Sequence, residues 1–225
     1  MSKKLKYFRN WIIFCIFIII LLFFEAIFLL FDIDFYELNT TDILLINFTK
    51  YSLLITLIIA FYYDYIKEKW IDFIKNFKHG TGLAFKYWIT GFFVMILSNG
   101  VISKFINGVG ENEKGVQNLI SQQPYFALIL TSFFAPFIEE FIFRKSLKDC
   151  FNSKLLYMIT SGVLFGLVHV LGAADPYEYL LIISYGAIGF FFAKIVSETD
   201  NVYFSIIVHA FHNFCLTILS IMVAL

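Results

Sequence analysis

The chain has 225 residues, of which 60% are hydrophobic, 20% are aromatic and only 15% are charged, and its mean hydropathy is +0.80. This composition is far too apolar for a soluble domain of this length, so the expected surroundings are lipid. The 17 basic residues balance the 17 acidic residues. We expect the lipid bilayer as a partner and no nucleic-acid partner.

The apolar residues lie in long runs rather than in short alternating strands, which disfavours a closed β-barrel. Each run is near the length that a helix needs to cross the core of a bilayer. The predicted fold is an all-α, polytopic transmembrane helix bundle of about seven spans. The spans are expected at about Trp11–Phe31, Ile43–Tyr63, Leu83–Ser103, Pro124–Phe143, Leu155–Ala173, Tyr179–Val196 and Val202–Leu225.

The basic residues are segregated between alternate connecting segments. If the N-terminus is cytoplasmic, 14 of the 17 Lys and Arg residues lie on the cytoplasmic side, against Lys104 and Lys114 outside and Lys50 within a span. Cytoplasmic segments of membrane proteins carry such an excess of basic residues. The first apolar run has no evident signal-peptide cleavage site and is interpreted as an uncleaved span. We expect a multi-pass protein of the cell membrane, with its N-terminus in the cytoplasm and its C-terminus outside.

Two connecting segments have distinct patterns. Residues Asp64–Gly80 interleave aromatic and aliphatic side chains with lysines, which predicts an amphipathic helix at the cytoplasmic face. Residues Lys104–Gln123 include Gly, Asn and Glu in close succession, so a flexible and solvated loop is expected there.

Ionisable side chains inside membrane spans are costly, and they mark functional sites or internal pairs. The fourth predicted span ends with Glu139 and Glu140, and Arg144 follows. Glu140 and Arg144 are four residues apart and share a helix face, whereas Glu139 is rotated from Glu140 by about 100°. This spacing assigns Glu140 to a pair with Arg144 and leaves Glu139 free to accept a proton. A simple cluster of charges at a helix end is the alternative.

Histidines occur in two later spans. His169 is the only ionisable residue of its apolar stretch, and a packed core histidine is the alternative to a catalytic one. His209 and Asn213 are one turn apart on a common face, as two converging hydrogen-bond donors require. The same pair would also suit hydrogen bonding between helices. His212 is expected to point about 60° away from His209.

A carboxylate, an imidazole and a His/Asn pair on three spans supply the groups that acyl-transfer hydrolysis needs: a general base, its partner and an oxyanion hole. At these positions the sequence resembles the CPBP family, which comprises the CAAX proteases and the bacteriocin-processing enzymes also called Abi proteins. The family pattern is EExxxR, FxxxH and HxxxN on successive membrane segments. It is matched in order by Glu139, Glu140 and Arg144, by Phe165 and His169, and by His209 and Asn213.

The resemblance implies an intramembrane endopeptidase of the glutamate type, with no cofactor. It implies that Glu139 and His169 activate water and that His209 and Asn213 hold the oxyanion. Glu140, Arg144 and Phe165 are implied as structural support. A zinc enzyme is the alternative, with Glu139, His169 and His209 as ligands. Zinc is disfavoured because Arg144 occupies one of the two carboxylates and because Asn is a poor zinc ligand but a good oxyanion donor.

The chain is expected to form one integral domain. Residues 1–123 would supply the N-terminal spans and the amphipathic connector, and residues 124–225 the catalytic membrane core. Counted along straight spans, Glu139 and His209 lie within about two turns of the cytoplasmic side, whereas His169 lies about four turns away.

The expected substrate is a membrane-associated peptide or protein, cleaved from the cytoplasmic side. It is either lipidated, as in CAAX-type processing, or connected with bacteriocin maturation or self-immunity. A non-catalytic membrane protein that binds or regulates a partner is the alternative function. A transporter is disfavoured, because the charges in other spans, Glu25 and Lys50, lack a partner motif and are expected to pair with other helices or to reach the interface.

Overall fold

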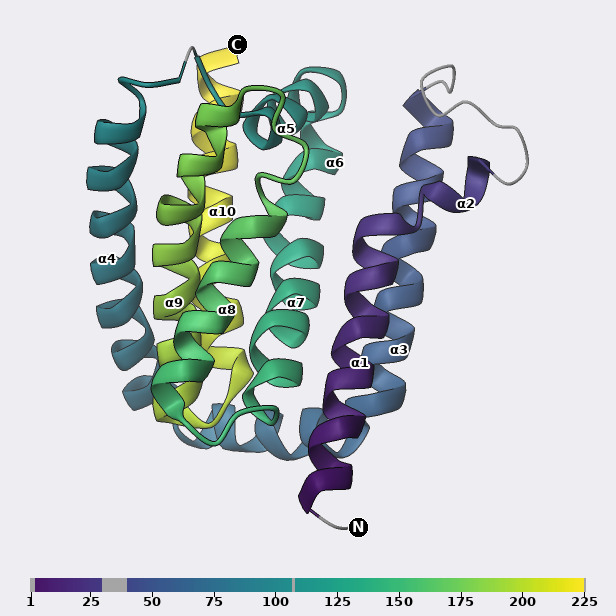
Figure 1. Cartoon of the computed structure of the whole chain (residues 1–225), viewed down its shortest axis with the longest axis vertical. Helices are drawn as coiled ribbons and strands as arrows, with labels where there is room; N and C mark the ends of the chain where they lie inside the picture. The colour runs from purple at the N-terminus through teal and green to yellow at the C-terminus, as the bar shows by residue number, and fades with distance from the viewer. Residues whose placement is uncertain (1–2, 30–39, 107, 225) are drawn as a thin grey trace.

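The computed structural model describes residues 3–29, 40–106 and 108–224, and every regular element among them is helical (Figure 1). The N-terminus lies at one end of the bundle and the C-terminus at the other. The elements are α1 (Lys3–Phe23), α2 (Ala26–Leu29), α3 (Thr40–Lys75), α4 (Phe77–Ile102), α5 (Glu111–Gln122), α6 (Pro124–Ile129), the π-helical η2 (Leu130–Phe134), α7 (Ala135–Glu140), the π-helical η3 (Phe141–Ser146), α8 (Lys154–Val168), the 3-10 helix η4 (Pro176–Leu180), α9 (Leu181–Thr199) and α10 (Val202–Ala224).

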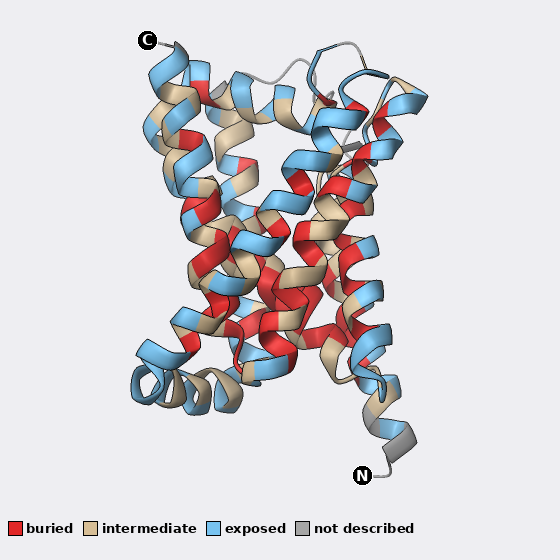
Figure 2. Cartoon of the chain, turned by 90° about the vertical axis from the view of Figure 1, so that its left-hand side faces the viewer, coloured by how far each residue is buried: buried red, intermediate tan, exposed pale blue. Residues whose placement is uncertain are grey.

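The buried core occupies the middle of the bundle and the part toward its N-terminal end (Figure 2). Large side chains such as Phe141, Phe143 and Ile195 are fully buried there. Toward the opposite end, where α5 and the C-terminus lie, exposed positions predominate. The two ends of the bundle are therefore packed differently.

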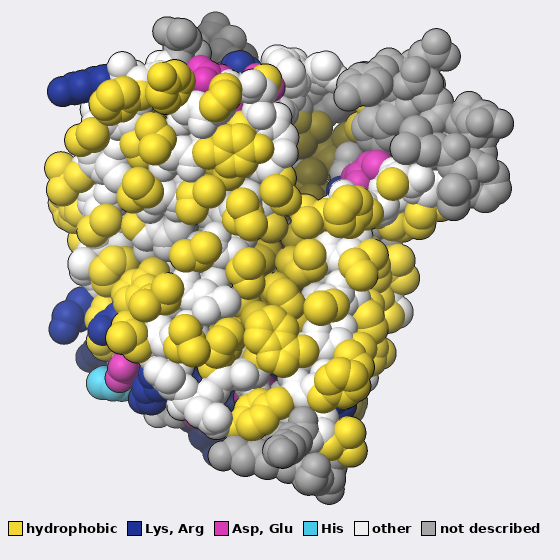
Figure 3. All heavy atoms as spheres, viewed as in Figure 1, with side chains coloured by type: hydrophobic (Ala, Val, Ile, Leu, Met, Phe, Trp, Pro, Cys, Tyr) yellow, Lys and Arg dark blue, Asp and Glu magenta, His cyan; other side chains and the backbone are white. Residues whose placement is uncertain are grey.

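Five helices of the described residues are long and apolar enough to cross a membrane: Thr41–Lys75, Phe77–Ile102, Pro124–Ser146, Pro176–Thr199 and Val202–Val223. Two shorter apolar helices lie within α1 and α8. Large hydrophobic side chains cover the outward faces of these helices (Figure 3), as contact with lipid requires. The chain is therefore a multi-pass, all-α membrane protein. The end of the first predicted span, residues 30 and 31, lies outside the described residues.

Helix α3 changes direction at Tyr62, whose φ of −124° and ψ of 20° are not helical. Beyond this kink it runs across the N-terminal end of the bundle, and α4 begins at Phe77 (Figure 1). This last part of α3 corresponds to the helix predicted for Asp64–Gly80. It packs on the bundle through Phe73, whose ring centroid lies 5.0 Å from that of Phe204. One helix thus supplies both a span and the connector.

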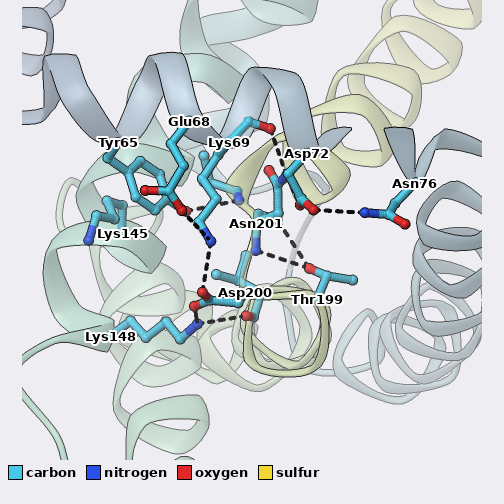
Figure 4. A network of polar contacts seen from close by, with 12 residues as sticks. Tyr65, Glu68, Lys69, Asp72, Asn76, Lys145, Lys148, Thr199, Asp200 and Asn201 are labelled. Atoms are coloured by element: carbon cyan, nitrogen blue, oxygen red, sulfur yellow. Dashed lines mark hydrogen bonds and ion pairs between the residues drawn. The ribbon is translucent and has the colours of Figure 1, made fainter. Parts of the chain in front are cut away.

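A polar network fastens this connector to the turn between α9 and α10 (Figure 4). Asp200 forms ion pairs with Lys69 of the connector, at 2.9 Å, and with Lys148. Asn201 Nδ2 donates hydrogen bonds to the Lys69 carbonyl (2.8 Å) and to the Asp72 carboxylate (2.7 Å). Burial acts to raise the pKa of Asp200, but the hydrogen bonds and charges of Lys148 and Lys69 outweigh it and hold this pKa below its ordinary value of 3.8.

The segment expected to be a flexible loop is helical from Glu111 to Gln122, so that expectation was wrong for most of its length. Glu111 and Glu113 lie in the first turn, where acidic side chains favour a helix. The backbone N–H of Glu111 also donates to Glu178 Oε2 at 2.9 Å, and the buried Ile120 anchors the other end of the helix. These contacts order α5 above the bundle.

The helix that corresponds to the fourth predicted span, Pro124–Ser146, continues beyond the predicted end at Phe143, and it contains two π-helical segments. In η2 the Ala135 N–H donates to the Leu130 carbonyl five residues earlier. The next bond of that pattern would join Thr131 to Pro136, but proline has no N–H to donate. The Thr131 carbonyl, about two turns before Glu139, is therefore left for another donor.

Helix α8 ends at Val168, five residues before the predicted limit of its span. It packs closely on α9 through glycines. A Cβ atom on Gly162 would lie 2.6 Å from the Gly186 carbonyl oxygen, and one on Gly166 would lie 2.6 Å from that of Ile182. Small residues allow such close approach of membrane helices. This packing fixes the position of α8 relative to α9, and with it the position of His169, which follows the last residue of α8.

Candidate active site

A cavity of about 540 Å³ brings together the four side chains that the motifs single out. Glu139 comes from α7, His169 follows the last residue of α8, and His209 and Asn213 lie on α10. The straight-span count places His169 about two turns farther from the cytoplasmic side than Glu139 and His209. In the structure the helix that carries Glu139 continues to Ser146 and α8 ends at Val168, so the three groups meet in one cavity.

Both carboxylate oxygens of Glu140 are engaged. Its Oε2 lies 3.2 Å from Arg144 Nε and accepts a 2.6 Å hydrogen bond from Ser205 Oγ, and its Oε1 accepts one of 2.9 Å from His209 Nδ1. The Arg144 contact is an ion pair by distance, although Nε does not meet hydrogen-bond geometry. The predicted pair is present, but Glu140 also fixes His209. Glu140 is not among the residues that line the cavity.

Arg144 is fully buried between aromatic rings. Its guanidinium carbon lies 4.5 Å from the centroid of Phe165 and 5.4 Å from that of Phe192, and Nη2 donates to the Gly189 carbonyl at 3.4 Å. Such ring faces attract a desolvated cation. Phe192 in turn stacks on His209 at 4.7 Å. Phe165 therefore supports the site through Arg144, and it also lines the cavity.

Glu139 is the carboxylate left for chemistry. Its side chain is 19% exposed, whereas that of Glu140 is 0% exposed. Glu139 Oε2 lies 3.7 Å from His209 Nε2, which is within ion-pair reach but too long for a hydrogen bond. The Glu139 carboxylate thus lines the cavity with capacity to accept a proton.

The tautomer of His169 follows from its partner. His169 Nδ1 lies 2.7 Å from the Phe165 carbonyl, which can only accept, so Nδ1 carries the hydrogen. In the neutral ring Nε2 then has a free lone pair. The ring is fixed by stacking on Tyr185 (4.7 Å) and by contact with Phe165 (4.4 Å).

Asn213 is positioned by the irregular helix opposite it. Its Nδ2 donates a 2.9 Å hydrogen bond to the Thr131 carbonyl, the group that Pro136 leaves without a helical partner. One amide hydrogen is used in this way, and the second remains for a ligand in the cavity. Sequence reasoning had no signal for this contact.

His212 was expected to point elsewhere, but it lines the same cavity. Its Nδ1 accepts a 3.3 Å hydrogen bond from the indole N–H of Trp88, which can only donate. The neutral ring of His212 therefore carries its hydrogen on Nε2. Ser205 was also missed, although it precedes His209 and Asn213 at four-residue intervals on one face of α10.

The arrangement does not fit the zinc alternative. Within the described part of the chain, no three side chains of His, Cys, Asp or Glu are grouped so that they could hold a metal ion. Glu139, His169 and His209 therefore do not form a joint ligand set.

The fold and the site define a class, that of multi-pass helical membrane proteins with the EExxxR, FxxxH and HxxxN motifs around one cavity. Residues 121–215 match the family model described as "Type II CAAX prenyl endopeptidase Rce1-like". This match contains all seven motif residues and confirms the resemblance. In this segment the chain is similar to the Rce1-like type II CAAX prenyl endopeptidase family, the CPBP or Abi family.

Two curated relatives agree with this placement. The chain is 32% identical over 145 residues to "Putative membrane peptidase YdiL" of Bacillus subtilis (strain 168), an alignment that covers 60% of this chain and 56% of that protein. It is 30% identical over 180 residues to an uncharacterized protein of Mycoplasma capricolum, which covers 73% of this chain and 52% of the relative. The chain spans about half the length of these relatives. No solved structure matches it.

Proposed function

We propose that the protein is an intramembrane endopeptidase of the glutamate type, which hydrolyses a peptide bond in a membrane-associated peptide or protein. The observation that carries this proposal is that the two adjacent carboxylates have different surroundings. Glu140 is fully engaged by protein groups, while Glu139 faces a cavity shared with His169, His209 and Asn213. A purely structural charge cluster would need neither the free carboxylate nor the cavity.

The nucleophile in this mechanism is a water molecule between Glu139 and His169. These two side chains make no ion pair with each other, and both line the cavity. Glu139 takes one proton as the water oxygen attacks the scissile carbonyl, and the Nε2 lone pair of His169 orients the water. The proton then passes to the leaving nitrogen as the C–N bond breaks. The products are a carboxylic acid and an amine, so all atoms are accounted for.

The oxyanion of the tetrahedral intermediate is held by His209 and Asn213. Since Nδ1 of His209 donates to Glu140, donation from Nε2 requires a second hydrogen, so the acting form is an imidazolium. Glu140, itself held by Arg144 and Ser205, stabilises this positive charge. Asn213 contributes its second amide hydrogen. Fixed donors of this kind are effective in a site that excludes bulk water.

We further propose that α1 and α8 complete a bundle of seven spans, with the N-terminus cytoplasmic and the C-terminus outside. Residues 1–123 form the N-terminal spans with the connector, and residues 124–225 form the catalytic core, in one integral domain. Contacts cross this boundary, because Trp88 bonds His212 and because Tyr51 of α3 lines the cavity. Both CAAX-type processing and bacteriocin maturation or self-immunity are compatible with this chemistry.

The test compares wild-type protein and Glu139→Gln, purified into nanodiscs and incubated with a library of membrane-anchored peptides in 18O-labelled water. We expect new C-termini that carry label with the wild type only, as read by mass spectrometry. Peptides that bind both proteins without being cut by either would instead establish the non-catalytic, partner-binding function.

A further inference from the structure

The cavity extends from the proposed active site toward one end of the molecule only. Its lining residues away from the motifs include the beginning of α3 (Asn47, Tyr51), the end of α4 (Met95, Asn99), α5, the η2 region (Leu130, Thr131), the first half of α9 (Tyr185, Ile188) and the later part of α10 (Leu216, Thr217). These parts are gathered at the end that holds α5 and the C-terminus (Figure 1). No lining residue comes from the connector in α3 or from the turn between η3 and α8.

The opposite end is closed by packed side chains. Between the site and this end of the bundle, the side chains are packed without exposure: Glu140, Phe143, Arg144, Leu147 and Ile195 are all 0% exposed. The connector and its network around Asp200 cover this end (Figure 4). A substrate cannot reach Glu139 from there without unpacking the core.

Besides extending toward the end of the molecule that holds α5, the cavity also opens sideways. Asn47 and Tyr51 of α3 line one side of the cavity, and Leu130, Thr131 and Ala135 line another. The space-filling view shows the surface hollowed in its upper half between the α1–α3 pair and the rest of the bundle (Figure 3). A peptide anchored in that half of the bilayer can therefore approach sideways.

The closed end is also the basic end. It holds the N-terminus, the connector, η3 and the turn after η3, which together with Lys78, Lys86, Lys154 and Lys194 carry 14 of the 17 Lys and Arg residues. Such an excess marks the cytoplasmic side of a membrane protein. From this side α8 rises about 22 Å to its last residue, in a hydrocarbon core of about 30 Å. His169 thus lies nearer the far surface.

We infer that the cavity opens to the extracytoplasmic side, and that the substrates are peptide segments presented there or in the outer half of the bilayer. The statement that substrates are cleaved rests on the proposed function. The statement that the cavity faces the extracytoplasmic side rests only on the position of the cavity and on the distribution of basic residues. This inference replaces the expectation of cleavage from the cytoplasmic side. It favours exported, membrane-associated peptides over lipidated C-termini displayed in the cytoplasm.

The first experiment maps the two ends by cysteine labelling. In a background with Cys15, Cys150 and Cys215 replaced by Ala, Gly115→Cys reports on the cavity mouth, where a Cβ meets nothing within 4 Å. Lys75→Cys, at the exposed end of the connector, is the matched control. A membrane-impermeant maleimide should label Gly115→Cys in intact cells and Lys75→Cys only after permeabilisation. The reverse pattern, or equal labelling, overturns the inference.

The second experiment compares the new peptide termini that cleavage creates in the membranes of two cell populations, one with the wild-type protein and one with Glu139→Gln. Ends that depend on Glu139 should lie in extracytoplasmic or outer-leaflet segments. If they lie only in cytoplasmic segments, the inferred substrate class is wrong. If Gly115→Cys is labelled from outside but no Glu139-dependent ends appear on either side, the sidedness stands and the proposed protease function fails.

Discussion

Replacing Glu140 by Gln tests whether this carboxylate supports the site rather than performing the chemistry. The side chains of Glu140 and Arg144 are both 0% exposed, and Glu140 also accepts hydrogen bonds from Ser205 and His209. Gln keeps the size but loses the charge, so Arg144 would remain as an uncompensated buried cation. Removing one partner of a buried ion pair costs about 3–5 kcal/mol. We expect a loss of that order in the free energy of unfolding.

The assay is denaturant unfolding of purified protein in one detergent, with the exposed Glu198→Gln as the matched control. A double variant, Glu140→Gln with Arg144→Met, removes both charges and should recover part of the lost stability, because no buried charge is left alone. Turnover per folded molecule should also fall in Glu140→Gln, since His209 loses its ionic partner, but by less than in Glu139→Gln. Glu140→Gln stability within about 1 kcal/mol of the Glu198→Gln control would refute the reasoning.

Four further predictions concern other parts of the molecule. Asn213→Ala should lower kcat about 10²- to 10³-fold with little change in KM, since an oxyanion donor acts mainly on the transition state; a change in KM alone would contradict this role. Gly166→Leu should reduce the yield of folded protein, because its Cβ would lie 2.6 Å from a carbonyl oxygen, whereas Gly172→Ala, with open space around it, should not; equal yields would contradict the close packing. Asp200→Asn should lower the unfolding temperature above pH 3.8, and this difference should disappear as pH falls through the lowered pKa of Asp200, because only the ionised carboxylate pairs with the lysines; a difference that persists in acid would contradict the ion pairs. Activity should survive a strong chelator, and its loss there with recovery by zinc alone would restore the zinc alternative.

The sequence predicts those features that depend on spacing within one helix. The four-residue separation of Glu140 and Arg144 forecasts their pair, and the separation of His209 and Asn213 forecasts their common face. The order of the motifs also forecasts that the groups meet, because ionisable side chains in separate spans are expected to face one interior. The two same-helix spacings are local consequences of helix geometry and need no knowledge of neighbouring helices.

Other features depend on packing between helices and had no local signal. The contact of Asn213 with Thr131 requires a π-helical segment, which composition does not reveal. His212 reaches the cavity because the cavity is wider than one helix face. Lys50 of α3 pairs with Glu25 in the turn between α1 and α2, a partner choice that helix periodicity cannot specify. Helix α5 is ordered by a distant side chain, Glu178.

The central claim is that Glu139 takes the proton from the attacking water. The most direct measurement is kcat for wild-type protein, Glu139→Gln and the control Glu198→Gln on one cleaved peptide, normalised to folded protein and with peptide binding measured in parallel. The account predicts that Glu139→Gln binds the peptide as wild type does but loses nearly all turnover, by at least about 10²-fold, while the control is unaffected. Glu139→Gln with wild-type turnover would contradict the account.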